Sequence, residues 1–169
     1  MNPKWITVHC SASRKGRYLT AQELRKFHTE PEPVGRGWSD IGYHIVIRTD
    51  GIVEEGRPMN RNGAHVRGHN RNNIGICLIG GLDIHGKPAD TYNEKQYHAL
   101  FATIVKLCEE HGIPFENVKG HRDWSPDLNK DGVITSDEFI KDCPCFDVQA
   151  WFKRQLSIYE LIGGDYAGG

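Results

Sequence analysis

The stretch IGICLIGG, residues 74–81, constrains the fold of this chain more than any other segment. It is apolar almost throughout and ends in two glycines. A run of this kind is typical of a strand that is buried on both faces, at the centre of a sheet. Helices must then cover both sides of that sheet. The sequence therefore predicts an α/β fold with a single mixed β-sheet flanked by helices.

Other local patterns supply the remaining elements. We expect strands in three further segments, the second of which is a hairpin around Asp50-Gly51. These segments are WITVHCSA (5–12), YHIVIRTDGIVEEG (43–56) and ENVKGHRD (116–123). Capping residues predict three helices: Thr20 before 21–28, Asn93 before 94–112 and Asp147 before 148–156. We expect one domain over residues 1–157 and a flexible tail over 158–169.

Charge and cysteine content exclude several functional classes. The 169 residues fit one domain, and a formal net charge of −1 gives no electrostatic reason to bind nucleic acid or an anionic membrane. No apolar run approaches the roughly 20 residues of a membrane-spanning helix, so we expect no membrane insertion. The N-terminus lacks a basic region followed by an apolar core, which predicts synthesis in a cytoplasm without a signal peptide. The spacing of the five cysteines suggests no disulfide framework and predicts reduced thiols.

Two histidines and a cysteine form a candidate zinc site. His9 lies in the first strand, His121 lies where a late strand should end, and Cys143 and Cys145 follow closely. Two histidines, one cysteine and a water are a typical set of ligands for a catalytic zinc. Spacing alone leaves open whether His9 meets His121. The alternative is a strand histidine and an unrelated Cys-Pro-Cys turn.

The segment DLNKDGVITSDE, residues 127–138, has the pattern of an EF-hand calcium loop. The predicted ligands, in loop order, are Asp127, Asn129, Asp131, the Val133 carbonyl, Thr135 through a water, and Glu138. Gly132 supplies the sharp turn. The preceding HRDWSP is not an entering helix, so a solvated acidic turn is the alternative, and a calcium sensor would need paired helix–loop–helix units. We expect a structural calcium that stiffens the loop between His121 and Cys143.

Five motifs occur in a fixed order: TVHCSAS, WSDIGYHIVIRTDGIVEEGR, GAHVRGHNRNNIGICLIGG, GHRD and KDCPCFDVQAW. Together they resemble the type-2 N-acetylmuramoyl-L-alanine amidase family, which includes phage lysozymes and peptidoglycan recognition proteins. The resemblance covers roughly residues 5–155 and is greatest to the single-domain phage endolysins. It implies the mixed sheet of that family and hydrolysis of the amide that joins N-acetylmuramic acid to L-alanine of the stem peptide.

The resemblance also implies roles for particular residues. The zinc ligands would be His9, His121 and Cys143, with Cys145 a bystander. Tyr43 and Lys141 would be catalytic, either in proton transfer or in stabilising the oxyanion. Three residues of the glycine-rich loop would border the substrate: His65, Arg67 and Asn70.

The resemblance further implies an enzyme that lyses the bacterial host. We expect a monomer that acts on peptidoglycan in the periplasm or cell wall after its release. Two alternatives stay open: a recognition protein that binds peptidoglycan without cleaving it, and an amidase that also inhibits a phage RNA polymerase. Retention of Cys143 disfavours the first, and no residue selects the second.

Overall fold

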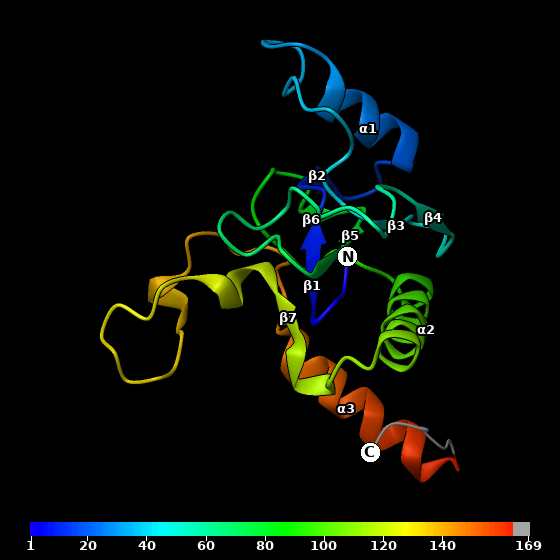
Figure 1. Ribbon diagram of the computed structural model, residues 1–169, viewed down its shortest axis with the longest axis vertical. Coiled ribbons are helices and arrows are strands. Elements are labelled where there is room, and N and C mark those ends of the chain that lie inside the picture. The colour runs from blue at the N-terminus through cyan, green and yellow to red at the C-terminus, as the bar shows by residue number, and fades with distance from the viewer. Residues whose placement is uncertain (164–169) are drawn as a thin grey trace.

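The computed structural model describes residues 1–163 and contains a five-stranded sheet in the order β4-β3-β5-β1-β7 (Figure 1). β5 (Asn73–Leu78) lies at its centre, and all six of its residues are buried. β3 (Ile45–Ile47) and β1 (Trp5–Cys10) run parallel to β5 on its two sides. β7 (Val118–Gly120) pairs in parallel with β1 at one edge, and β4 (Val53–Glu55) pairs antiparallel with β3 at the other. The predicted central strand is therefore confirmed.

The β3–β4 hairpin forms around the predicted Asp50-Gly51 turn. Gly51 has a φ of +84°, which a glycine adopts without strain, and the Asp50 carboxylate accepts a hydrogen bond from the Ile52 N–H (3.2 Å). Several other elements are too short to leave a pattern in the sequence and were not predicted. They are the paired strands β2 (Ser13–Arg14) and β6 (Gly81–Leu82) and the 3-10 helices η1 (Phe115–Asn117), η2 (His121–Trp124) and η3 (Ser136–Glu138).

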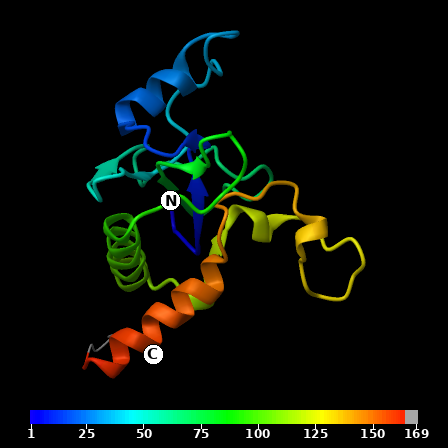
Figure 2. The same cartoon turned by 180° about the vertical axis from the view of Figure 1, so that it is seen from behind.

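The three α-helices divide between the two faces of the sheet. α2 (Glu94–His111) and α3 (Val148–Leu161) pack on the face that carries Ile6, Val8, Ile74 and Ile76. α1 (Ala21–Thr29) packs on the other face, over β3 and β5, and Figures 1 and 2 show it far from α2 and α3. Because side chains alternate across a strand, His9 shares the face of α1. The apolar cluster under α1 draws on β3 and β5 and includes no residue of β1. The His9 face of β1 is instead approached by the 3-10 helix η2, whose Trp124 Nε1 donates a hydrogen bond to Thr7 Oγ1 (2.9 Å).

All three predicted helix starts are confirmed. Thr20 with Glu23, and Asn93 with Gln96, form reciprocal capping boxes, and the Asp147 carboxylate accepts a hydrogen bond from the N–H of residue 150. Each cap satisfies N–H groups that a helix start would otherwise leave unpaired. The local capping pattern therefore predicted all three starts, and long-range hydrogen bonds from Ala21 to Glu54 and from Asn93 to the Thr49 carbonyl add to two of them.

The predicted start of the C-terminal tail is wrong. α3 continues to Leu161, beyond the expected boundary at residue 157, and the Tyr159 ring lies 5.9 Å from the Phe101 ring of α2. This contact stabilises a further helical turn, which the sequence pattern did not predict. Residues 164–169 lie outside the described residues. Within residues 1–163, no helix is both long enough and apolar enough to cross a membrane.

Candidate metal centre

Three side chains converge at the carboxyl ends of β1 and β7. The Nδ1 atoms of His9 and His121 lie 3.1 Å apart, and the Cys143 Sγ lies 3.8 Å from His9 Nδ1. A tetrahedral zinc with bonds of about 2.05 Å to nitrogen and about 2.3 Å to sulfur separates its ligand atoms by about 3.3 Å (N to N) and about 3.6 Å (N to S). The three side chains therefore fit one zinc ion. Among residues 1–163, no other three His, Cys, Asp or Glu side chains bring their ligand atoms within 4.8 Å of one another.

The sheet places the two histidines. His9 is the penultimate residue of β1 and is almost fully buried. β7 lies parallel beside β1 and ends at Gly120, so His121 leaves the sheet at the same end. Two histidines that are 112 residues apart in the chain thus meet through parallel pairing.

Backbone hydrogen bonds place Cys143. Its carbonyl accepts a hydrogen bond from the Arg122 N–H (2.8 Å), and its Sγ accepts one from the Cys10 N–H (3.2 Å). A Cβ at Gly120 would lie 2.9 Å from Pro144 Cδ, so only glycine permits this approach of the two segments. The Cys145 thiol is directed elsewhere and donates a hydrogen bond to the carbonyl of residue 81 (3.2 Å).

Burial keeps the two histidines neutral. It lowers the pKa of His9 well below the ordinary value and that of His121 to about 4, and the Lys141 ammonium adds to both shifts. Neutral imidazoles offer their lone pairs to a metal. The neighbouring Cys10 thiol, with burial as the second cause, raises the pKa of Cys143. Uptake of zinc must therefore release the proton of this thiol.

Tyr43 lies beside the candidate ligand His9 and lines a cavity with His121 and Cys143, and its catalytic role stays a prediction. Its ring centroid is 5.2 Å from that of His9 and 5.6 Å from that of His28. Burial raises the pKa of the Tyr43 hydroxyl well above its ordinary value. The group therefore keeps its proton at neutral pH and can donate a hydrogen bond.

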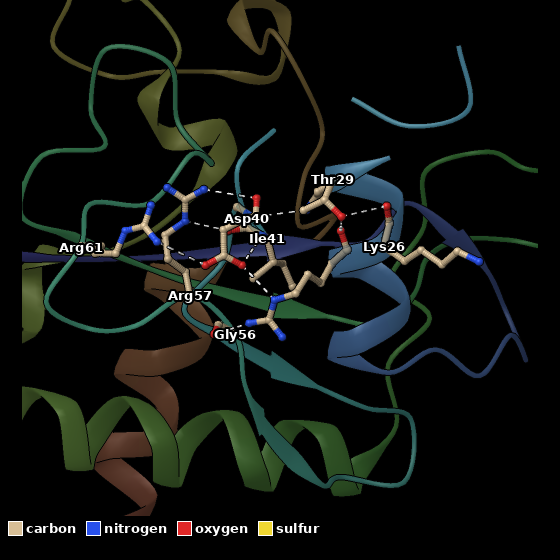
Figure 3. A network of polar contacts seen from close by, with 10 residues as sticks. Lys26, Thr29, Asp40, Ile41, Gly56, Arg57 and Arg61 are labelled. Carbon is tan, nitrogen blue, oxygen red and sulfur yellow. Dashed lines mark hydrogen bonds and ion pairs between the residues drawn. The ribbon is translucent and has the colours of Figure 1, made fainter. Parts of the chain in front are cut away.

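A polar network holds the segment that leads into Tyr43 (Figure 3). The Asp40 carboxylate accepts hydrogen bonds from Arg25 Nε (2.8 Å) and the Ile41 N–H (2.7 Å). Arg57 is buried and donates from Nε to the Ile41 carbonyl (2.7 Å), while its N–H donates to the Tyr43 carbonyl (2.7 Å). Such a network restrains the backbone that carries Tyr43, whose ring packs against His9.

Lys141 is exposed and lines two connected hollows. A cavity of about 220 Å³ is lined by Tyr43, His121, Lys141 and Cys143, and it shares His121 and Lys141 with an open groove of about 600 Å³. Two of the candidate ligands line the smaller cavity, and the volume of the groove lies in the range of small-molecule binding sites. The structure thus places Lys141 on the same cavity as His121 and Cys143, and its catalytic role stays a prediction.

The three predicted substrate-contacting residues all line the groove, but they differ in what they touch. Arg67 is exposed. The Asn70 side-chain oxygen accepts hydrogen bonds from the backbone N–H groups of His65 and Val66 (both 2.8 Å), so it also holds the loop together. His65 is buried and contacts His9. Their contact with substrate stays a prediction.

Arg36 and two tryptophans also line the groove and were missed from the sequence. The Arg36 guanidinium lies 5.3 Å from the centroid of the Trp38 ring, at one side of the groove, and Trp124 lies in the η2 segment. The signal was present, because GRGW directly precedes the SDIGY motif and HRDW includes the candidate ligand His121. Arginine stacked on an aromatic ring is a common recognition element.

The 127–138 loop projects from the body of the molecule (Figure 1). Its side-chain oxygens bind the loop's own backbone. Glu138 accepts hydrogen bonds from the N–H groups of Leu128 (2.7 Å) and Thr135 (2.8 Å), and Asp127 accepts one from Gly132 (2.8 Å). Gly132 has a φ of +87°, as the predicted turn requires. The loop's carboxylates do not gather around one point within 4.8 Å, and calcium binding stays a prediction.

Comparison with known proteins agrees with this geometry. The family model described as N-acetylmuramoyl-L-alanine amidase matches residues 1–133. The endolysin of Enterobacteria phage K11 is 36% identical over 158 residues, which are 94% of this chain and 88% of that protein. The endolysin of Klebsiella phage KP32 is 34% identical over 161 residues, 95% of this chain and 90% of that protein.

A solved structure gives the same result for the fold. The N-acetylmuramoyl-L-alanine amidase LysC from Clostridium intestinale superposes with a TM-score of 0.67 at 27% identity, over 92% of this chain and 86% of that chain. The match includes the mixed sheet with its flanking helices. The chain therefore belongs to the N-acetylmuramoyl-L-alanine amidase family.

Proposed function

We propose that this protein hydrolyses the amide between N-acetylmuramic acid and L-alanine of the peptidoglycan stem peptide, with a zinc ion held by His9, His121 and Cys143. The convergence of these three ligands in a chain of the amidase family carries the proposal. Similarity to phage endolysins over 94–95% of the chain supports a role in lysing a bacterial host.

The chain's own groups complete the chemistry. When bound, zinc supplies the Lewis acidity that activates water and polarises the scissile carbonyl. Tyr43 lines the cavity, and its hydroxyl, which burial keeps protonated, would donate a hydrogen bond to the substrate there. The Lys141 ammonium faces the same cavity and stabilises negative charge on the carbonyl oxygen as it becomes tetrahedral. The groove orients the stem peptide so that its first amide enters the cavity.

The direct test is mass spectrometry of purified peptidoglycan after digestion. Release of intact stem peptides with a free L-alanine amino group is expected. Glycan fragments with the peptides still attached would show a different bond specificity, and no cleavage by the zinc-loaded protein would contradict the proposal.

Two cysteine variants test the ligand set. Cys143→Ala should lose zinc and lytic activity, because the third ligand is removed. Cys145→Ser is the matched control and should keep most of both, because its thiol bonds a carbonyl instead. Zinc content is measured by atomic emission. Full zinc occupancy in Cys143→Ala, together with no zinc in Cys145→Ser, would make Cys145 the third ligand instead of Cys143.

Non-catalytic peptidoglycan recognition is the second candidate. It predicts binding of muropeptides without cleavage. The presence of all three ligand side chains, with Tyr43 and Lys141 on the same cavity, favours the enzyme. Digestion of purified peptidoglycan separates the two, because only the enzyme releases peptides.

We also propose the setting in which the enzyme acts. It is a monomer whose partner is bacterial peptidoglycan, reached in the periplasm or cell wall after synthesis in the host cytoplasm. It needs neither nucleic acid nor membrane insertion. Light scattering of the purified protein tests whether it is a monomer. Comparing lysis by protein produced inside the host with lysis by protein added from outside tests where it acts.

A structural calcium ion in the 127–138 loop is a separate proposal. It is supported by the residue types at the six ligand positions and by the turn at Gly132. The two ends of the loop are joined, since the Ile140 N–H donates to Ser125 Oγ (3.0 Å), and both residues line the groove that also borders His121. A calcium ion would bind the loop's oxygen atoms in place of the hydrogen bonds within the loop. It would not compete with zinc, because the candidate zinc ligands are nitrogen and sulfur atoms.

A further inference from the structure

His65 lies behind His9, on the side away from the other two candidate ligands. Its Nδ1 is 2.9 Å from His9 Nε2, and the two rings are nearly perpendicular, at 83°. His9 Nδ1 is the atom that faces His121 and Cys143. The two nitrogens of His9 thus have separate partners.

The hydrogen positions on both rings follow from one fixed acceptor. His65 Nε2 lies 3.1 Å from the backbone carbonyl of Asn73, and a carbonyl only accepts hydrogen bonds. His65 Nε2 therefore carries the hydrogen, and His65 Nδ1 has a free lone pair. That lone pair accepts a hydrogen bond from His9 Nε2, which leaves the lone pair of His9 Nδ1 free.

Two glycines form the slot that holds the His65 ring. A Cβ at Gly75, in β5, would lie 2.7 Å from His65 Cδ2, and a Cβ at Gly63 would lie 2.3 Å from the same atom. Neither glycine has the positive φ that often requires glycine. Their contribution is space, and Gly75 marks a close approach inside a buried strand.

We propose that His65 is a positioning residue that fixes the metal-binding tautomer of His9, through the chain from the Asn73 carbonyl to His65 to His9. This inference rests on the proposed zinc role of His9. It gives His65 a function apart from contact with substrate. Hydrogen bonds to the second nitrogen of a metal-ligating histidine raise its affinity for the metal, and their loss typically costs 10- to 100-fold.

A matched pair of variants tests the proposal. In His65→Asn the side-chain oxygen replaces the Nδ1 acceptor, whereas His65→Leu has a similar size and no acceptor. Competition with a chelator should show zinc affinity within a few-fold of wild type for asparagine and about 10- to 100-fold weaker for leucine. Equal affinities in all three proteins, or an equal loss in both variants, would overturn the proposal.

The tautomer itself can be observed in the wild-type protein by ¹⁵N NMR of the histidine rings. We expect the hydrogen of His9 on Nε2 both with and without zinc. A hydrogen on Nδ1 in the metal-free protein overturns the inference, even if the leucine variant fails to fold. A wild-type protein that binds no zinc but has the Nε2 tautomer would refute the proposed zinc function and leave the hydrogen-bond chain intact.

Discussion

Tyr43 shows how the environment of a single side chain decides what it can do. Its ring is fixed next to His9, and burial raises its pKa well above the ordinary value. A phenol that keeps its proton serves as a hydrogen-bond donor. It does not serve as a base in the working range of pH. The neighbouring Lys141 ammonium supplies a full positive charge to the same cavity.

Tyr43→Phe and Lys141→Ala should therefore lower turnover by one or more factors of ten, the size of effect expected for a positioned donor or charge. Zinc content and melting temperature should stay close to wild type. Since the Tyr43 hydroxyl does not titrate, the ratio of wild-type to Tyr43→Phe turnover should be constant between about pH 6 and pH 9. Lys153→Ala, on the exposed side of α3, is the control for Lys141. Near wild-type turnover in both variants would remove them from the mechanism.

At this scale the sequence indicates chemistry better than it indicates contacts. The types and order of His9, His121 and Cys143 were sufficient to propose a zinc site, but only the pairing of β7 with β1 shows that the histidines meet. The link from His65 to His9 was not predictable, because it depends on a loop folding back over Gly75.

The elements followed from the sequence wherever a local pattern was long enough. The buried run at 74–81 gave β5, and the capping residues gave the starts of all three helices. The end of α3 was missed because it depends on a contact between Tyr159 and Phe101, which are far apart in sequence. The 3-10 helix that follows β7 was missed for a different reason, since four residues are too few to show a period.

The proposed calcium ion would act on the 127–138 loop. With calcium bound, the loop should be stiffer and the whole protein should melt at a higher temperature, because binding to the folded state alone stabilises it. Glu138→Gln should abolish this calcium-induced shift while zinc is retained. Asp137→Asn removes the same charge at a position that supplies no ligand, so it should keep the shift. Hydrogen exchange of residues 124–142 should slow on calcium addition in wild type. No heat, no shift and no change in exchange on calcium titration would mean that the loop is only an acidic turn.

At the scale of the whole molecule, the parallel strands and their connections gather positive charge at one end of the sheet. Arg36 follows α1, Arg67 belongs to the loop before β5, and Lys141 follows the 127–138 loop. All three line the groove, and none of the groove's lining residues in the described chain is acidic. A net charge of −1 for the whole chain conceals this local excess. The groove is therefore suited to a peptide with free carboxylates, which is what a stem peptide offers.

Arg36→Gln and Arg67→Gln should weaken binding of stem peptides with free carboxylates and leave their amidated counterparts nearly unaffected. Each exposed arginine–carboxylate pair contributes up to about 1 kcal/mol, so KM should rise by up to about five-fold per substitution. The effect should shrink as salt is raised toward about 1 M, where the screening length falls to about 3 Å. Arg154→Gln, on the exposed surface of α3, is the matched control and should leave KM unchanged for both the free and the amidated peptides. An equal rise in KM for free and amidated peptides would show that the two arginines shape the groove without reading the charge of the substrate.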